Sequence, residues 1–262
     1  QVGGMARRAT KVKEERSASP YVLLLDAGNS IHGDEYLTQR TQGAVAIAAM
    51  NLLNYDAMAL GAGDFQLGLE TLRARIAEAK FPILSANVFV SETNQPFVTP
   101  YIIKDIGGYR VAIFGLTDVE NVATVLDEDA QEFKLLDPVE TAQQLAAALR
   151  PQADLIIALS HLGTTRNHQL ADTVPGIDVI VGGLVRYRSE EPWRSKVNGT
   201  LLVEADVPST GHAGRRIGVL RLQLEGGGIA DYHWTNVALG PEYADDPEMS
   251  ALLERYEALE GE

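Results

Sequence analysis

The sequence of 262 residues contains no cysteine. Disulfide bonds, thiolate metal sites and cysteine nucleophiles are therefore excluded, whereas the cellular compartment is left open. Long apolar runs are also missing, because the runs at 21–25 and 155–159 have the length of a strand. A helix that crosses a bilayer needs roughly 20 apolar residues. The sequence therefore predicts a soluble protein without a membrane span.

Basic residues are scarce relative to acidic ones, with 22 Lys and Arg against 36 Asp and Glu and a formal net charge of -14. This balance argues against nucleic acid as a partner, because binding there depends on basic groups that displace counterions from phosphates. An acidic protein can still bind a phosphate compound locally, through metal ions or the amino ends of helices.

Several common catalytic motifs are missing from the sequence. There is no Gly-x-Ser-x-Gly elbow, no Gly-x-x-x-x-Gly-Lys phosphate loop and no His-Glu-x-x-His helix. The run Gly226-Gly227-Gly228 lies between two predicted strands and does not precede a helix. It is therefore interpreted as a hairpin turn and not as a phosphate-binding loop.

Apolar periodicity predicts an alternation of strands and amphipathic helices through the first two thirds of the chain. The strand-length runs are 21–25, 57–60, 83–87, 154–159 and 178–181, and the helical patterns are 4–15, 43–53, 67–79, 138–149 and 167–173. Gly107-Gly108 between apolar runs predicts a hairpin, and only strands are predicted from 200 to 237. We expect an α/β fold with mixed sheets and helices on the outer faces.

Polar residues follow several of these predicted strands. They are Asp26, Asn29, Asp64, His161 and the turn Gly182-Gly183. Ligands of open α/β sheets gather at the carboxyl ends of the strands, so this edge is the expected site. The pattern alone is shared by many α/β proteins.

Six segments, taken in order, resemble the amino-terminal domain of 5'-nucleotidases and nucleotide-sugar hydrolases, a branch of the calcineurin-like metallophosphoesterases. They are 3–10, 25–30 (Leu-Asp-Ala-Gly-Asn-Ser), 50–61, 81–88, 160–163 (Ser-His-Leu-Gly) and 177–183. The resemblance implies a multi-layer α/β/β/α domain over residues 1–243 and a connector-like helix over 244–262. It also implies an extracytoplasmic location, and it places the family's first strand and its Asp-x-His motif before Gly3, outside this sequence.

Members of this family are similar in using two divalent metal ions, which clamp a phosphate ester and activate a water molecule. Residue types that cannot serve stand at most of the matching positions. Asn29 stands where the resemblance implies a bridging carboxylate, Ala62 where it implies an Asn ligand, and Gly63 where it implies the catalytic His. Leu184 and Arg186 stand at two further histidine positions.

His161 alone keeps a ligand type at a matching position, and one imidazole cannot hold a catalytic metal ion. His161 is a candidate residual metal ligand or anion contact, and Arg186 is a candidate anion contact because a guanidinium can bind a phosphate or carboxylate bidentately. The alternative interpretations are a hydrogen-bonded histidine at a strand end and an arginine in an exposed loop. For Asp26 we expect the capping of turn N–H groups, and for Asp64 either a structural role or a cation contact.

The leading hypothesis is a degenerate, non-catalytic member of the family that binds a partner protein or a small anion and needs no cofactor. The alternative is an active metal-dependent phosphohydrolase with two divalent metal ions, altered coordination by Asn29 and Asp64, and an upstream first motif. A third reading is an assembly subunit, because the predicted helix at 246–259 carries an apolar stripe that can contact a partner or a second copy of the chain. The stripe consists of Leu252, Leu253, Tyr256 and Leu259.

Overall fold

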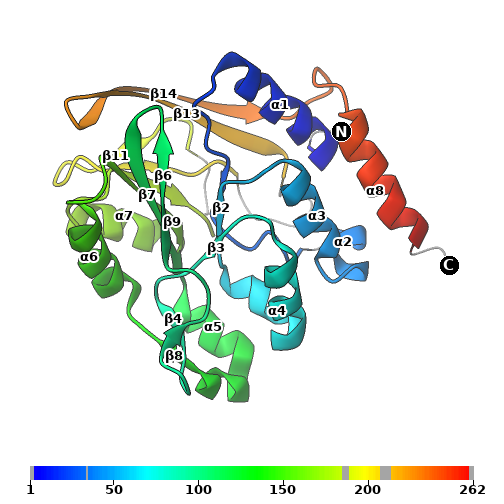
Figure 1. Ribbon diagram of the computed structural model, residues 1–262, viewed down its shortest axis with the longest axis horizontal. Coiled ribbons are helices and arrows are strands. Elements are labelled where there is room, and N and C mark those ends of the chain that lie inside the picture. Colours follow the sequence, from blue (N-terminus) through cyan, green and yellow to red (C-terminus); the bar gives the residue numbers. More distant parts are fainter. Residues whose placement is uncertain (1–2, 34, 185–188, 207–213, 260–262) are drawn as a thin grey trace.

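The computed structural model describes residues 3–33, 35–184, 189–206 and 214–259. Two β-sheets pack face to face in the centre of the molecule, and helices cover their outer faces (Figure 1). The expected α/β/β/α architecture with mixed sheets is therefore confirmed. Ala57, Ala59 and Leu84 of the smaller sheet pack against Ile113 and Ile157 of the larger one.

The smaller sheet is parallel, with the order β1 (Leu25–Asp26), β2 (Ala57–Ala59) and β3 (Ile83–Leu84). The strand predicted at 21–25 is shortened to its last residue and the aspartate after it. The reason lies at Leu24, whose N–H donates to the Asp56 carboxylate at 2.8 Å instead of to a strand backbone. A side chain thus takes over the first bond that a longer strand would make.

Five helices belong to the side of the smaller sheet. They are α1 (Met5–Ala18), α2 (Tyr36–Arg40), α3 (Ala44–Leu52), α4 (Leu69–Glu78) and α8 (Pro247–Leu259). The helices α1 and α8 lie side by side although they come from opposite ends of the chain (Figure 1). Lys13 of α1 reaches Asp246, whose carboxylate also accepts the N–H of Met249 at 3.0 Å and so caps α8.

The apolar stripe of α8 is largely used within the chain. Met249 and Leu252 are buried in the core, and Leu253 and Tyr256 pack against it. Leu259 remains 70% exposed at the end of the helix. No helix among the described residues has the length and apolar character that a bilayer crossing requires.

The larger sheet has the order β11-β12-β10-β9-β7-β6. Its strands are β6 (Tyr101–Ile106), β7 (Tyr109–Thr117), β9 (Leu155–His161), β10 (Val179–Gly182), β11 (Trp193–Arg194) and β12 (Leu201–Val203). The strands β7, β9, β10 and β12 are parallel, and β6 joins β7 through the expected Gly107-Gly108 hairpin. Helices α6 (Pro138–Leu149) and α7 (Thr164–Thr173) cover its outer face, and Asp137 caps α6 directly before Pro138.

Smaller elements complete the fold. The hairpin β13 (Arg216–Glu225) and β14 (Gly228–Ala238) turns at the glycine run, as the sequence predicts. The helices α5 (Val119–Leu126), η1 (Ala62–Leu67) and η2 (Asp127–Glu132) and the strands β4 (Val88–Val90), β5 (Gln95–Pro96) and β8 (Phe133–Leu135) were not predicted. Phe65, Phe97 and Phe133 hold this region through ring contacts of 5.1 to 5.9 Å between centroids.

The two sheets touch backbone to backbone where β3 meets β7. A Cβ atom at Gly115 would overlap the carbonyl of Leu84, so the position needs a glycine. The N–H of Ala86 donates to the Gly115 carbonyl at 2.8 Å, and Thr117 Oγ1 donates to the Leu60 carbonyl at 2.7 Å. These bonds tie the carboxyl ends of β3 and β2 to β7 beside the candidate site.

Candidate functional site at the carboxyl ends of the strands

The structure brings the turns after β1, β2, β9 and β10 into one place. The Gly63 N–H lies 2.8 Å from Asn29 Oδ1, and His161 Nδ1 lies 2.7 Å from the Ala27 carbonyl oxygen. A Cβ atom built on Gly183 would lie 2.7 Å from His161 Nδ1, which places the turn before Leu184 against the same imidazole. The positions 29, 62, 161 and 184 therefore border one site, whereas Arg186 lies outside the described residues.

Asp26 closes the turn that follows β1. Its Oδ1 accepts the N–H of Gly28 at 2.9 Å, and both of its oxygens accept the Ser30 hydroxyl at 2.8 Å. Gly28 has a φ of 100°, which an L-residue rarely adopts. The Asp26 carboxylate thus holds the tight turn, as the usual behaviour of aspartate after a strand predicts.

Asp64 is fully buried and collects backbone N–H groups from two turns. Its Oδ2 accepts from Gly61 at 2.9 Å and from Asn29 at 3.2 Å, and its Oδ1 accepts from Ile31 at 3.2 Å and from His32 at 3.4 Å. Burial raises the pKa of Asp64 to about 7, although three of these N–H groups act in the opposite direction. Its oxygens are therefore occupied by the backbone, and its charge is easily lost.

Asn29 stands at the position of the implied bridging carboxylate. Its backbone has a φ of 61°, a left-handed conformation that asparagine tolerates better than most residues. Its side-chain oxygen is the acceptor of the Gly63 N–H. The amide oxygen is thus already used within the protein.

His161 is the exception among the matching positions. The ring is 2% exposed, and its Nε2 has no hydrogen-bond partner among the described residues. Because a carbonyl oxygen only accepts, the bond to Ala27 assigns the proton to Nδ1 and leaves a lone pair on Nε2. Burial lowers the pKa of His161 and favours this neutral form.

A neutral imidazole with its Nδ1 proton on a backbone carbonyl is the form that binds metal ions through Nε2. The same form offers no proton to an anion. Of the two roles considered for His161, a residual ligand position is thus favoured over an anion contact. The geometry also matches the alternative interpretation, a structural histidine that is hydrogen-bonded at the end of a strand.

A pair of divalent ions needs a dense set of carboxylate and imidazole donors. Within the described part of the chain, no group of three or more His, Cys, Asp and Glu side chains is placed to hold a metal ion. Ala62, Gly63 and Leu184 have no side-chain donor, and the oxygens of Asn29 and Asp64 already accept backbone N–H groups. The described donor set does not fit two metal ions.

A second buried polar cluster borders the turn after β10, and the sequence analysis did not single it out. Glu204 follows β12 and is buried, and its carboxylate accepts from Asn167 Nδ2 at 3.1 Å and from Thr164 Oγ1 at 3.4 Å. Ser160 donates to Asn167 Oδ1 at 2.7 Å. Burial raises the pKa of Glu204. An acidic residue directly after an apolar strand was the available signal.

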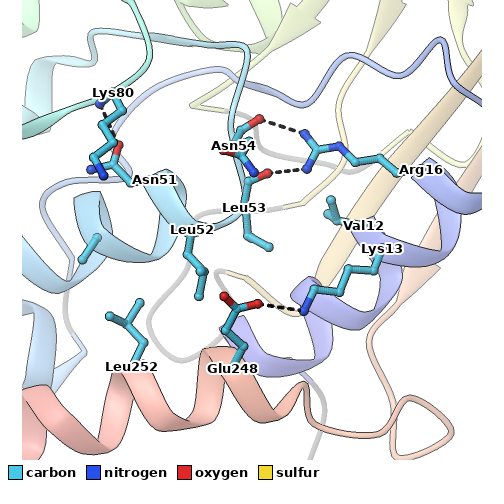
Figure 2. A pocket seen from close by; sticks show the side chains of 11 residues that line it. Val12, Lys13, Arg16, Asn51, Leu52, Leu53, Asn54, Lys80, Glu248 and Leu252 are labelled. Atoms are coloured by element: carbon cyan, nitrogen blue, oxygen red, sulfur yellow. Dashed lines mark hydrogen bonds and ion pairs between the residues drawn. The ribbon is translucent and has the colours of Figure 1, made fainter.

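A groove of about 600 Å³ lies away from the strand ends, between α1, α3 and α8 (Figure 2). Apolar side chains of Leu52, Leu53 and Leu252 border it. Two of its basic groups already have partners, because Lys13 pairs with Glu248 at 3.3 Å and Arg16 donates to the carbonyls of Leu53 and Asn54. The groove thus joins three helices and shares no residue with the site.

Comparisons with known proteins agree with this architecture. The chain is 32% identical to human 5'-nucleotidase over 274 residues, which cover 97% of this chain and 47% of that protein. It is 38% identical to a snake venom 5'-nucleotidase of Crotalus adamanteus over 187 residues, covering 69% of this chain and 31% of that protein. A 5'-nucleotidase precursor from Thermus thermophilus superposes with a TM-score of 0.84 at 28% identity, over 98% of this chain and 53% of that chain.

A scan against models of known protein families finds no match. The layered fold and the meeting of four strand ends nevertheless define a metallophosphoesterase domain, and the relatives specify its branch. The chain belongs to the 5'-nucleotidase family of the calcineurin-like metallophosphoesterases. It spans about half the length, or less, of these three relatives.

Proposed function

We propose that this chain is a non-catalytic domain of the 5'-nucleotidase family that acts by binding. The observation that carries the proposal is the donor set at the strand ends. Of the matching positions that the structure describes, only His161 offers a side-chain donor that no protein group uses. A single imidazole cannot hold two cations or polarise a phosphate ester between them.

The proposal is tested by hydrolysis of nucleoside monophosphates and of a generic phosphate ester with added Mn²⁺, Zn²⁺ or Mg²⁺. We expect no turnover above that of the metal ions alone. The matched variants are His161→Ala and His233→Ala, since His233 is exposed on β14, remote from the site residues in sequence. Turnover that persists in His233→Ala and disappears in His161→Ala would overturn the proposal.

One observation favours the alternative, an active metal-dependent phosphohydrolase. The buried Nε2 of His161 lacks a partner among the described residues, and a metal ion would satisfy it. Metal analysis of the purified chain distinguishes the two functions. Two equivalents of a transition metal per chain support the hydrolase, whereas a content well below one equivalent supports the binding domain.

The binding role requires a small anion, a partner protein or a second copy of the chain, and α8 is the element expected to make a contact with a protein. Because Leu252 is buried in the chain's own core and Leu253 and Tyr256 pack against it, Leu259 at the end of α8 is the exposed member of the helix's apolar stripe. We therefore propose a second copy as the occupant of this end. Light scattering of the intact chain and of Leu259→Glu tests it, and a monomer in both removes it.

An extracytoplasmic location is part of the proposal. It is supported by the likeness to relatives of which one is named as a venom protein. Fractionation of the source cells checks it, and recovery of the chain only with cytoplasmic markers contradicts it.

A further inference from the structure

The turn after β1 and the turn after β2 are held together by two side chains. Asp64 reaches from the second turn to the N–H groups of Asn29, Ile31 and His32 in the first. Asn29 reaches in the opposite direction, to the N–H of Gly63. We call this reciprocal set of hydrogen bonds between Asn29, Asp64 and the backbone the clasp.

The clasp depends on the glycines of the second turn. A Cβ atom on Gly63 would lie 2.8 Å from Asn29 Nδ2 and 3.0 Å from Asn29 Oδ1, closer than real Cβ contacts. A Cβ atom on Gly61 would overlap the same amide. The Asn29 side chain thus occupies the space into which any larger residue at position 63 would begin to extend.

Asn29 and Gly63 are the two positions at which the family resemblance implies a bridging carboxylate and a catalytic histidine. Their replacements are not independent losses, because each one accommodates the other. With Asn29 in place, a histidine at position 63 must displace the amide and break its bond to the backbone. A substitution at only one of the two positions therefore does not produce the residue pair that the resemblance implies.

We propose that the clasp replaces bound cations as the link between the two turns, so that this end of the domain keeps its shape without divalent metal ions. The inference rests on the proposed function in one respect only, namely that no cation bridges these turns. The Asn29–Gly63 coupling is a separate property of the chain, and it can be measured separately.

The first experiment is a thermal unfolding cycle with Gly63→Ala, Asn29→Gly and the double variant. Gly63→Ala should lower Tm by about 2–6 °C, because the added methyl group displaces the Asn29 amide from a backbone N–H. In the Asn29→Gly background, the same substitution should change Tm by less than about 1 °C, because the obstructing amide is gone. Asn29→Gly is preferred to alanine because glycine accepts the positive φ.

Gly33→Ala is the matched control for the cycle. It lies close to Asn29 in sequence, and a Cβ atom there would meet nothing nearer than Thr38 at 3.9 Å. Its Tm should equal that of the wild type within about 1 °C. Additive effects of Asn29→Gly and Gly63→Ala would overturn the coupling, and with it the clasp.

The second experiment compares Tm of the wild type in EDTA with Tm in excess Mn²⁺ or Zn²⁺. We expect equal values, since an ion that does not bind the folded state cannot stabilise it. A rise in Tm with metal that is lost in His161→Ala would overturn the proposal that no cation links the turns. Phosphate ester turnover in the wild type would instead end the proposed function and the metal-free link between the turns, and would leave the Asn29–Gly63 coupling in place if the unfolding cycle shows it.

Discussion

The turns after β2 and β9 both lie at positions that correspond to the family's ligand motifs, and they differ in how their polar groups are used. In the turn after β2, no donor atom is free, because Asp64 is bonded to four N–H groups and Gly63 makes room for Asn29. In the turn after β9, His161 keeps a buried nitrogen without a partner among the described residues. The polar groups of the turn after β2 are bonded within the protein, whereas the imidazole at the end of β9 keeps one nitrogen without such a bond.

This difference shows that residues at the positions of the family's ligand motifs can serve to hold the protein's own turns together. A buried polar atom without a partner costs free energy, so a vacated site tends toward internal hydrogen bonds. At the turn after β2, the oxygens of Asp64 and Asn29 all accept backbone N–H groups. At His161 only one ring nitrogen is satisfied in this way: Nδ1 is bonded to the Ala27 carbonyl, and Nε2 has no partner among the described residues.

The largest effect should come from Asp64. Asp64→Ala leaves four buried or half-buried N–H groups without an acceptor, and we expect a loss of about 3–5 kcal/mol in the free energy of unfolding. Denaturant unfolding measures it, with the exposed Asp231→Ala on β14 as control. A loss below about 1 kcal/mol would show that the turn after β2 does not depend on this carboxylate.

The stability difference between the wild type and Asp64→Asn should depend on pH. The pKa of Asp64 is about 7 in the folded protein and close to 3.8 in a free side chain. The folded state therefore binds a proton that the unfolded chain releases, and this contribution is complete below about pH 4 and lost as the pH rises through 7. Between about pH 5 and pH 8, the wild type should lose about 2–3 kcal/mol relative to Asp64→Asn.

Urea unfolding of both proteins at the two pH values measures this difference, because groups common to both chains cancel. A difference that stays constant with pH would mean that the four N–H groups outweigh burial and keep Asp64 charged.

A smaller effect is expected at His161. His161→Leu removes the bond to the Ala27 carbonyl but also removes the unpartnered Nε2, so the two terms offset each other. We expect a loss of about 1–2 kcal/mol in the free energy of unfolding, the same in EDTA and in added Zn²⁺. A loss that grows when Zn²⁺ is present would show that His161 binds a metal ion, as the family's ligand residues do.

The smallest loss in the free energy of unfolding is expected for a substitution in the groove of Figure 2. This groove lies outside both turns and serves as a reference for them. Arg16 donates to the carbonyls of Leu53 and Asn54 at the end of α3, in a partly exposed setting. Arg16→Met keeps the apolar stem and should cost about 0.5–1 kcal/mol by urea unfolding. A cost equal to that of Asp64→Ala would remove the contrast between the clasp and ordinary helix capping.

The sequence predicts the fold well where local chemistry decides it. The glycine pair at 107–108 forces a hairpin, and Asp137 before Pro138 starts a helix, because both signals act over a few neighbouring residues. Asp118 before α5 caps its helix in the same way, with its Oδ1 accepting the Glu120 N–H at 3.2 Å, and this signal was overlooked. The shortened β1 depends on Asp56, a residue 32 positions away, and no local pattern contains that bond.

The location of the candidate site can be predicted from the sequence, whereas its hydrogen bonds cannot. Parallel strands bring their carboxyl ends to one edge, so the meeting of Asn29, Ala62 and His161 follows from the order of elements. The bond from Gly63 to Asn29 joins residues 34 positions apart and depends on a positive φ at Asn29. A glycine in such a turn suggests flexibility in the sequence, whereas in the structure it leaves room for a neighbour's amide.

The backbone contact at Gly115 bears on how such a domain can change its function. The carbonyl of Leu84 packs directly against the backbone of Gly115, with no side chain between them. The two sheets therefore cannot shift against each other at this point without a backbone clash. The frame that aligns the four turns is thus fixed by main-chain packing that does not involve the residues of the site. Substitutions at the rim that leave this backbone contact intact therefore leave the packing of the two sheets in place.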